Sequence, residues 1–380
     1  MSGQLYHLSV RKSLGRMYPE NIKYHFLEDK IRIISSKAFR RLEYKTQVFI
    51  NYIGDHYRTR LTHSLEVSQI AIYIAKELRL NEELAAVISL SHDIGHPPFG
   101  HAGEDVLNLL SEKFGGFDHN VHTIKIVTKL EKSSDHYNGL NLTLETIDGL
   151  LKHNGPIDNR SQQLKLREIL VNYAIKLNQN TSLESQVSAL ADEIAYIKHD
   201  IDDGIRANFI KITDLQALNI TKLFDITKII QNNFLTQEIK LRTILSNIND
   251  CLVRDLINQT IKNIQQYNIN CMDDIYNSKQ FVVSFSKQLQ EHLLELKEFL
   301  YRNVYKNYKV NRIALKTKNI ITDLFHYFMN HPKTLRNLSP EHNINYSDKL
   351  LVESVINYIA GMTDRFAVEE HKRIFDPYHY

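Results

Sequence analysis

The densest group of chemically active side chains lies in residues 91–105, SHDIGHPPFGHAGED, where three histidines and three acids fall within fifteen positions. His92 and Asp93 end the stretch 82–94, which is apolar almost all round and therefore predicts a buried helix. The proline pair that follows at 97–98 cannot continue that helix. Burying a carboxylate beside an imidazole is costly without a counter-ion. A divalent cation would supply that charge, so the pattern predicts a metal site.

Two other segments could complete the metal site. In RTRLTHSLEV, Arg60 and His63 stand three residues apart, so both can project to one side at the start of a helix. Farther along, Asp192, Tyr196 and Asp200 follow one another at steps of four, as one polar stripe on a helix whose other sides are Leu and Ile. The alternative interpretation of this stripe is an exposed acidic face beside a lysine.

The donor types narrow the choice of metal. A site of two imidazoles and two carboxylates becomes neutral when a divalent cation binds, and the candidate ligands are His63, His92, Asp93 and Asp192. Mixed nitrogen and oxygen donors suit Mn, Fe, Zn, Co or Ni better than a pure magnesium cage. A metal that takes more than four ligands would keep positions open for water or a phosphoryl oxygen.

Helices must position these residues, because helical spacing dominates wherever apolar residues recur and no convincing alternating strand is present. We expect an all-α fold. Neither a repeat of fixed period nor a linker interrupts the chain, which favours one helical body. The expected helices cover 63–80, 82–94, a segment from about 100–103 onward, 119–131, 142–153, 184–203, 236–265, 281–302, 308–330 and 347–360.

Composition excludes several classes of protein. Gly and Pro together make 20 of 380 residues, about 5% against an average of roughly 12%, which disfavours turn-dense all-β and collagen-like chains. The 47 Lys and Arg residues against 44 Asp and Glu leave a net charge of +3, which excludes a histone-like chain or an acidic tail. Two cysteines cannot form a disulfide framework, and no apolar run would span a bilayer. We therefore expect a cytoplasmic protein.

The order His63, His92-Asp93, Asp192 resembles the metal-binding signature of the HD hydrolase superfamily, and within it the chain resembles the bacterial dGTPase-like deoxynucleoside triphosphate triphosphohydrolases. The resemblance implies an all-helical HD-domain fold with additional C-terminal helices. It divides the chain into a catalytic core with an N-terminal substrate-binding segment, 1–220, and a C-terminal helical region packed on that core, 221–380. The matching blocks are SSKAFRRLEYKTQVF (35–49), GDHYRTRLTHSLEVSQIA (54–71), LSHDIGHPPFGHAGED (90–105), GFDHN (116–120), GLNLTLETIDGLLKHNGP (139–156), LADEIAYIKHDIDDGIRA (190–207) and YIAGMTDRFAV (358–368).

The resemblance also implies a role for each matched residue. The reaction implied is attack of water on the α-phosphorus, after which the nucleoside leaves and the triphosphate is released whole. His101 would move the proton, as general base or as general acid, while His96 could instead only bind phosphate. The implied groups are metal ligands (His63, His92, Asp93, Asp192), substrate contacts (Arg60 to phosphate, Gln47 and Asp200 to the sugar 3'-hydroxyl, Tyr196 to the deoxyribose) and residues of the phosphate channel (His96, His101 and His119, with Glu104 paired to His101).

Two other functions stay open. One is an HD-type phosphohydrolase of nucleoside monophosphates or of guanosine tetraphosphate, although a monophosphatase would not need an extended phosphate channel. The other is a non-catalytic nucleotide sensor or a nucleic-acid-binding ring with the same fold. The partners implied are a dNTP substrate, further copies of this chain in a dimer-based oligomer such as a hexamer, and an allosteric dNTP.

Several charged and histidine residues have simpler interpretations. His136, His153 and His199 are expected to be structural or exposed. Arg40, Arg41 and Lys45 could bind phosphate, but they could also face water or a neighbouring subunit. The basic stretch 310–320 could bind an activating nucleotide or, weakly, single-stranded nucleic acid; its charge density favours a solvated surface. The aromatic residues of 299–328 are expected in the core.

Overall fold

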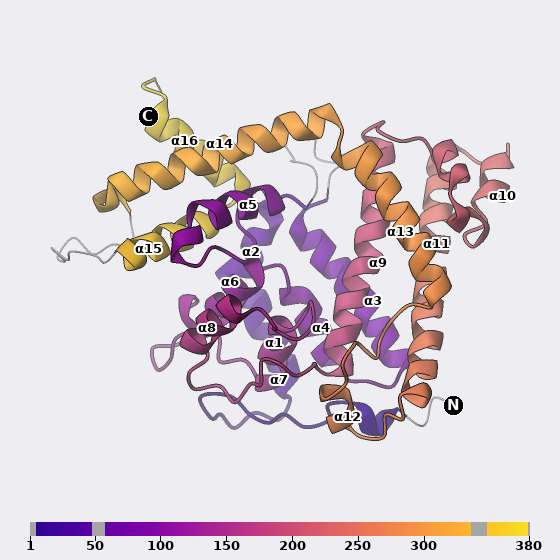
Figure 1. The fold of residues 1–380 in the computed structure, drawn as a ribbon, viewed down its shortest axis with the longest axis horizontal. Helices are drawn as coiled ribbons and strands as arrows, with labels where there is room; N and C mark the ends of the chain where they lie inside the picture. Colours follow the sequence, from indigo (N-terminus) through magenta and orange to yellow (C-terminus); the bar gives the residue numbers. More distant parts are fainter. Residues whose placement is uncertain (1–4, 48–57, 336–347, 379–380) are drawn as a thin grey trace.

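The computed structural model describes residues 5–47, 58–335 and 348–378. Within these ranges the chain forms helices joined by loops, and only three isolated β-bridges occur in place of a sheet (Figure 1). The all-α fold class is therefore confirmed. No helix in the described ranges is both long enough and apolar enough to cross a membrane.

The α-helices agree with most of the expected ranges and add α1, α2, α8, α10, α12 and α16, which the expected ranges lack. In chain order they are α1 (His25–Ser35), α2 (Lys37–Arg41), α3 (Arg60–Glu77), α4 (Glu82–Ser91), α5 (His101–Leu110), α6 (His119–Lys125), α7 (Leu144–Leu151), α8 (Arg160–Ile169), α9 (Leu183–Arg206), α10 (Ile226–Gln231), α11 (Gln237–Gln266), α12 (Met272–Tyr276), α13 (Lys287–Leu300), α14 (Tyr308–Asn330), α15 (Asp348–Ala360) and α16 (Asp364–Phe375).

Two expected boundaries are corrected. The helix expected over 82–94 ends at Ser91, so the His-Asp pair stands on the turn directly after α4. The helix expected from 281 begins only at Lys287, after the N-cap Ser286. The reason is that Val282 and Val283 donate their backbone N–H groups to the Gln186 side chain at 2.7 and 3.1 Å, which holds this segment outside a helix.

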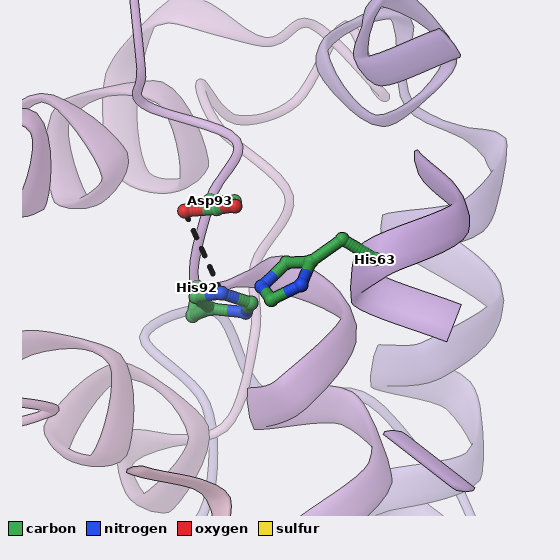
Figure 2. A group of neighbouring side chains, drawn as sticks. All are labelled: His63, His92 and Asp93. Atoms are coloured by element: carbon green, nitrogen blue, oxygen red, sulfur yellow. Dashed lines mark ion pairs between the residues drawn. The ribbon is translucent and has the colours of Figure 1, made fainter. Parts of the chain in front are cut away.

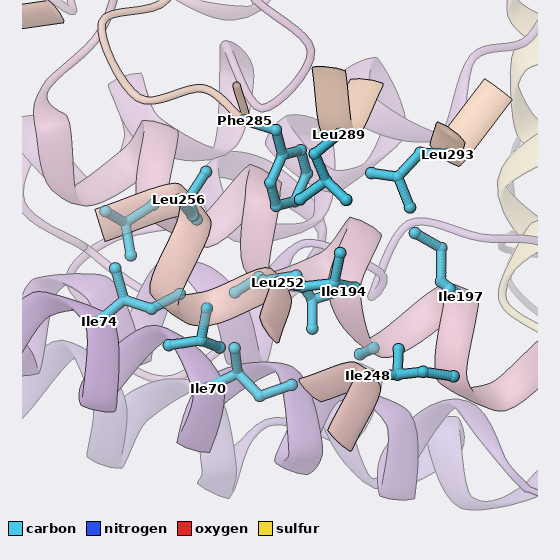
Figure 3. Packing of buried hydrophobic residues seen from close by; sticks show 14 of the residues in the cluster. Ile70, Ile74, Ile194, Ile197, Ile248, Leu252, Leu256, Phe285, Leu289 and Leu293 are labelled. Carbon is cyan, nitrogen blue, oxygen red and sulfur yellow. The ribbon is translucent and has the colours of Figure 1, made fainter. Parts of the chain in front are cut away.

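Hydrophobic packing around α3 and α9 holds the two helices that carry His63 and Asp192. Ile74 of α3 and Ile194 of α9 are fully buried against Leu252 of α11, and α13 closes the other side (Figure 3). This cluster includes both Ile220 and Phe224, so it continues across the division expected between 220 and 221. The two helices that carry His63 and Asp192 are therefore held by core contacts along their length.

A separate cluster joins the C-terminal helices to the loop and helix after the His-Asp pair. Phe99 and Leu107 pack with Ile321 of α14 and Ile359 of α15. Figure 1 shows α14 running over α5. The C-terminal region therefore covers α5, the helix that carries His101 and Glu104.

Candidate metal centre and active site

The four predicted metal ligands come from three elements and lie around His92; we call them the ligand cluster (His63, His92, Asp93, Asp192). Thr59 caps α3 by accepting the N–H of Thr62, which sets His63 near the start of the helix. His63 Nε2 lies 2.8 Å from Asp192 Oδ1 on α9. Figure 2 shows His63 pointing toward the His92-Asp93 pair, and one ligand atom from each of these three residues lies within 4.8 Å of the others.

The environment of His92 fits a cation. Its Nδ1 lies 2.7 Å from the carbonyl oxygen of Ser89, while its Nε2 is buried and has no hydrogen-bond partner in the part of the chain that the structure describes. That Nε2 faces carboxylate oxygens of Asp93 and Asp192 at 3.5 and 3.6 Å. Burial alone would lower the pKa of His92, but the two carboxylates outweigh it and raise the pKa to about 9. The position therefore attracts positive charge, as a divalent metal site must.

Arg60 lies against the ligand cluster. It is 1% exposed, and its Nη1 donates to Asp93 Oδ2 at 2.8 Å. Burial would raise the pKa of Asp93, but Arg60 and His92 hold it well below its usual range. A Cβ atom at Gly100 would stand 2.6 Å from Arg60 Nη2, and the φ of Gly100 is +58°, so only glycine lets the chain pass here without strain.

Three histidines surround one carboxylate beside the ligand cluster; we call this the Glu104 cluster (His96, His101, Glu104, His119). Glu104 Oε1 lies 2.7 Å from His119 Nδ1, and Glu104 Oε2 lies 3.2 Å from His101 Nδ1. Burial would raise the pKa of Glu104, but these two histidines lower it, and the net shift is downward. The His101 side chain is 64% exposed, so this cluster opens to solvent.

His96 joins the two clusters into one site. Its Nε2 lies 3.1 Å from Asp93 Oδ1, and its ring stacks on the ring of His119 with the centroids 3.9 Å apart. His96, Glu104 and His119 are also close enough together to hold a cation themselves. The arrangement can therefore combine a metal with a partly exposed acid/base group.

Two of the predicted sugar contacts, Tyr196 and Asp200, lie beside Tyr305, an aromatic residue that packs against the core as expected. The Tyr305 hydroxyl donates to both carboxylate oxygens of Asp200 at 2.8 Å and lies 2.6 Å from the Tyr196 hydroxyl. Burial and the neighbouring Asp203 raise the pKa of Asp200 to about 8 despite this bond. Gln47 is the last described residue of its segment, and its buried Oε1 has no hydrogen-bond partner among the described residues. The block residues 48–57 lie outside the described residues.

His153 and His199, which we expected to be structural or exposed, both lie at the ligand cluster, whereas His136 is exposed. His153 is buried, with its Nε2 3.4 Å from Asp192 Oδ2. His199 is fully buried, with its Nδ1 3.1 Å from His63 Nδ1. Nothing in the local sequence distinguishes them from core histidines, because their partners lie far away in the chain.

Lys45 and Asp364 fasten the site to the C-terminal helices. Lys45 is 2% exposed and donates to the carbonyl oxygens of His96 and Ala360, so of the alternatives left open for it, a side chain that faces water is wrong. Burial, with help from the nearby Arg41, lowers the pKa of Lys45 to about 7. Asp364 accepts the backbone N–H groups of Thr46 at 2.9 Å and Phe99 at 2.8 Å. One residue of the C-terminal region therefore ties together the two segments that lead to Gln47 and to α5.

Comparison with known proteins gives matches over nearly the whole chain. The HD domain model matches residues 60–197, and the phosphohydrolase-associated domain model matches residues 283–373. A deoxyguanosinetriphosphate triphosphohydrolase-like protein of Geobacter sulfurreducens is 42% identical, with 97% of this chain and 93% of that protein covered. A protein with the same description from Caulobacter sp. (strain K31) is 40% identical, with 96% and 94% covered. A hypothetical protein from Aquifex aeolicus with a crystal structure shares 18% identity at a TM-score of 0.39, with 93% of this chain and 72% of that chain covered.

Proposed function

The chain belongs to the deoxyguanosinetriphosphate triphosphohydrolase-like family of HD-domain proteins, and from this premise we propose that it is a metal-dependent hydrolase of deoxynucleoside triphosphates. The products would be a deoxynucleoside and tripolyphosphate. The observation that carries the proposal is the convergence of His63, the His92-Asp93 pair and Asp192 beside Arg60.

The ligand cluster would hold the metal, because it presents two imidazoles, two carboxylates and a buried His92 Nε2 without a partner. Mn, Mg, Fe, Zn, Co and Ni are the candidate ions. When bound, a divalent ion supplies Lewis-acid polarisation of a phosphoryl oxygen and offsets the negative charge that develops on it. Arg60 adds a planar guanidinium whose geometry suits phosphate oxygens.

The Glu104 cluster would move the proton. In the proposed reaction the oxygen of water forms a bond to the α-phosphorus, and the bond from that phosphorus to the nucleoside 5'-oxygen breaks. One proton of the water leaves during attack, and the 5'-oxygen gains a proton. His101 is the most exposed histidine of this cluster and Glu104 orients it, so His101 can perform either transfer. His96 and His119 would bind the charged phosphate chain.

The sugar would lie against Tyr196, with Asp200 and Gln47 on its 3'-hydroxyl. The Tyr305 hydroxyl now occupies both carboxylate oxygens of Asp200, so Tyr305 belongs to the same proposed subsite. A tyrosine ring leaves little room for a 2'-hydroxyl, which would select deoxynucleotides over ribonucleotides.

The test is to incubate the protein with each dNTP and with GTP, in the presence of Mn or Mg, alone and mixed, and to identify the products by chromatography. We expect tripolyphosphate and a deoxynucleoside from dNTPs. Replacing Asp93→Ala should abolish the reaction while circular dichroism shows the same helical content.

Two outcomes would contradict the proposal. Inorganic phosphate released from a nucleoside monophosphate, without tripolyphosphate from any dNTP, would indicate a monophosphatase. Nucleotide or nucleic-acid binding without any hydrolysis would indicate a sensor, and the exposed Arg312 and Lys316 of α14 would then be the first residues to replace.

The remaining expectations stay predictions. They are the cytoplasmic location, the dimer-based homo-oligomer, the allosteric dNTP, and the division into a catalytic core over 1–220 with a C-terminal region over 221–380. Size-exclusion chromatography with light scattering, with and without dNTPs, would test the oligomer.

A further inference from the structure

A chain of three side chains runs from the ligand cluster to the protein surface. His63 Nδ1, on the ring edge away from Asp192, lies 3.1 Å from His199 Nδ1. The opposite nitrogen of that second ring, His199 Nε2, lies 2.7 Å from Glu66 Oε2. Both imidazoles are fully buried, whereas the Glu66 side chain is 38% exposed. The contacts therefore begin at a solvent-accessible carboxylate and end at a predicted metal ligand.

The hydrogen-bond directions along this chain follow from the charge of Glu66. Arg58 Nε lies 3.3 Å from Glu66 Oε1, and Lys198 Nζ lies 4.0 Å from Glu66 Oε2, so two cations favour the ionised carboxylate. An ionised carboxylate can only accept, so His199 must donate from Nε2. A neutral imidazole that donates from one nitrogen accepts at the other. His199 Nδ1 then accepts from His63 Nδ1. The lone pair of His63 is left on Nε2 for a cation that also binds Asp192 Oδ1, which lies 2.8 Å from Nε2.

We propose that Glu66 and His199 are positioning residues that fix His63 in the tautomer whose Nε2 can bind the metal. The proposal rests on the proposed function in one respect, namely that His63 is a metal ligand. Neither residue touches the reacting atoms, so their effect passes through His63. Histidine ligands in metal sites generally donate their second ring N–H to a fixed acceptor.

The position of each histidine in its helix explains why only one of them needs such a relay. His92 follows the C-terminus of α4, where the last carbonyl groups have no partner within the helix, and the carbonyl of Ser89 accepts from its Nδ1. His63 lies near the N-terminus of α3, where the carbonyls already accept helical hydrogen bonds. Its acceptor must come from another element, and His199 on α9 supplies it.

The test compares Glu66→Gln and His199→Gln with the parent and with Glu77→Gln, which removes the same charge from an exposed position of the same helix. The first measurement is the dissociation constant for Mn²⁺. We expect it to rise about 10- to 100-fold in both relay variants. The Glu77→Gln control should match the parent, and Glu66→Asp, which keeps a carboxylate, should lie between the parent and Glu66→Gln.

The second measurement is the tautomer of His63 from ¹⁵N NMR of metal-free protein labelled at histidine, with the signal assigned by its loss in His63→Gln. We expect a proton on His63 Nδ1 in the parent, independent of any proton that Nε2 donates to Asp192. Glu66→Gln should lose the proton on Nδ1, because an amide can donate to His199. A purely structural role would alter stability without changing this tautomer.

The outcomes separate the two proposals. If the parent binds Mn²⁺ through His63, but both relay variants bind it within twofold of the parent and keep its tautomer, the relay is wrong and the proposed function stands. If the parent binds none of the candidate divalent ions, the proposed function fails. The His63 tautomer in the metal-free parent and in Glu66→Gln then still decides whether the relay exists.

Discussion

The ligand cluster and the Glu104 cluster touch through His96 but are built in different ways. The first gathers side chains from α3, the turn after α4, and α9, and its two histidines are almost wholly buried. The second comes entirely from the segment 96–119, and His101 is mostly exposed. Residues that hold an ion in a fixed position benefit from rigid packing between distant parts of the chain. Residues that exchange protons with a substrate must remain accessible.

The largest expected effect would come from breaking the ligand cluster. Replacing Asp192→Ala removes the carboxylate that faces His63, His92 and His153. We expect the proposed dNTP hydrolysis to fall at least about a thousandfold, because removing one residue of a group that acts together removes most of the effect of the group. Elemental analysis of the purified variant should show loss of bound metal. Retained metal with retained activity would remove Asp192 from the ligand set.

The second prediction distinguishes the role of the Glu104 cluster from that of the ligand cluster. Glu104→Gln keeps the shape of the side chain but removes the charge that orients His101 and His119. We expect kcat to fall about 100- to 10,000-fold, the usual contribution of general acid/base catalysis, with metal content unchanged. If the variant lost bound metal as well as kcat, the group of His96, Glu104 and His119 would hold an ion. The assignment of metal binding to the ligand cluster and proton transfer to the Glu104 cluster would then be wrong.

The third prediction tests whether the Glu104 cluster depends on a residue far away in the chain. Asp364→Ala would leave the buried N–H groups of Thr46 and Phe99 without an acceptor. Each such donor costs about 1–3 kcal/mol of stability, which urea unfolding can measure. Because Phe99 leads into α5, kcat should fall while the Mn²⁺ dissociation constant stays constant. Equal losses of metal affinity and kcat would show that Asp364 supports both clusters.

The last effect is a change in the pH dependence of stability, and it concerns Asp200, which belongs to neither cluster and contacts Tyr305. The Asp200 pKa of about 8 means that the native state retains a proton that the unfolded chain releases near pH 4. Stability should therefore fall as the pH rises from about 4 to 8, by up to about 1.4 kcal/mol per pH unit from this group. Asp200→Asn should flatten this slope in urea unfolding at pH 5.5, 6.5 and 7.5. Asp203, whose pKa is raised to about 7, contributes with the same sign and remains in the variant. An unchanged slope would contradict the buried, neutral carboxyl.

The sequence allowed the all-α fold and most helix ranges to be predicted, because the apolar spacing of α9 and α14 is strongly periodic. It also allowed the convergence of the four ligands to be expected, through the resemblance to a known family. The contacts of His199 with His63, of Tyr305 with Asp200 and of Asp364 with Thr46 and Phe99 could not be predicted in the same way. Each of these residues acquires its partner only when helices far apart in the chain pack together, and each has ordinary neighbours in sequence.

The continuity of the hydrophobic cluster across residue 220 limits how the enzyme could be shortened. A fragment that stopped there would leave the faces of α3 and α9 that α11 and α13 cover open to water. The covered contacts belong to the same two helices that carry His63 and Asp192, so a shortened chain would lose packing that holds these helices in place. Engineering a smaller catalyst from this chain would require redesigning that uncovered surface before any change to the site itself.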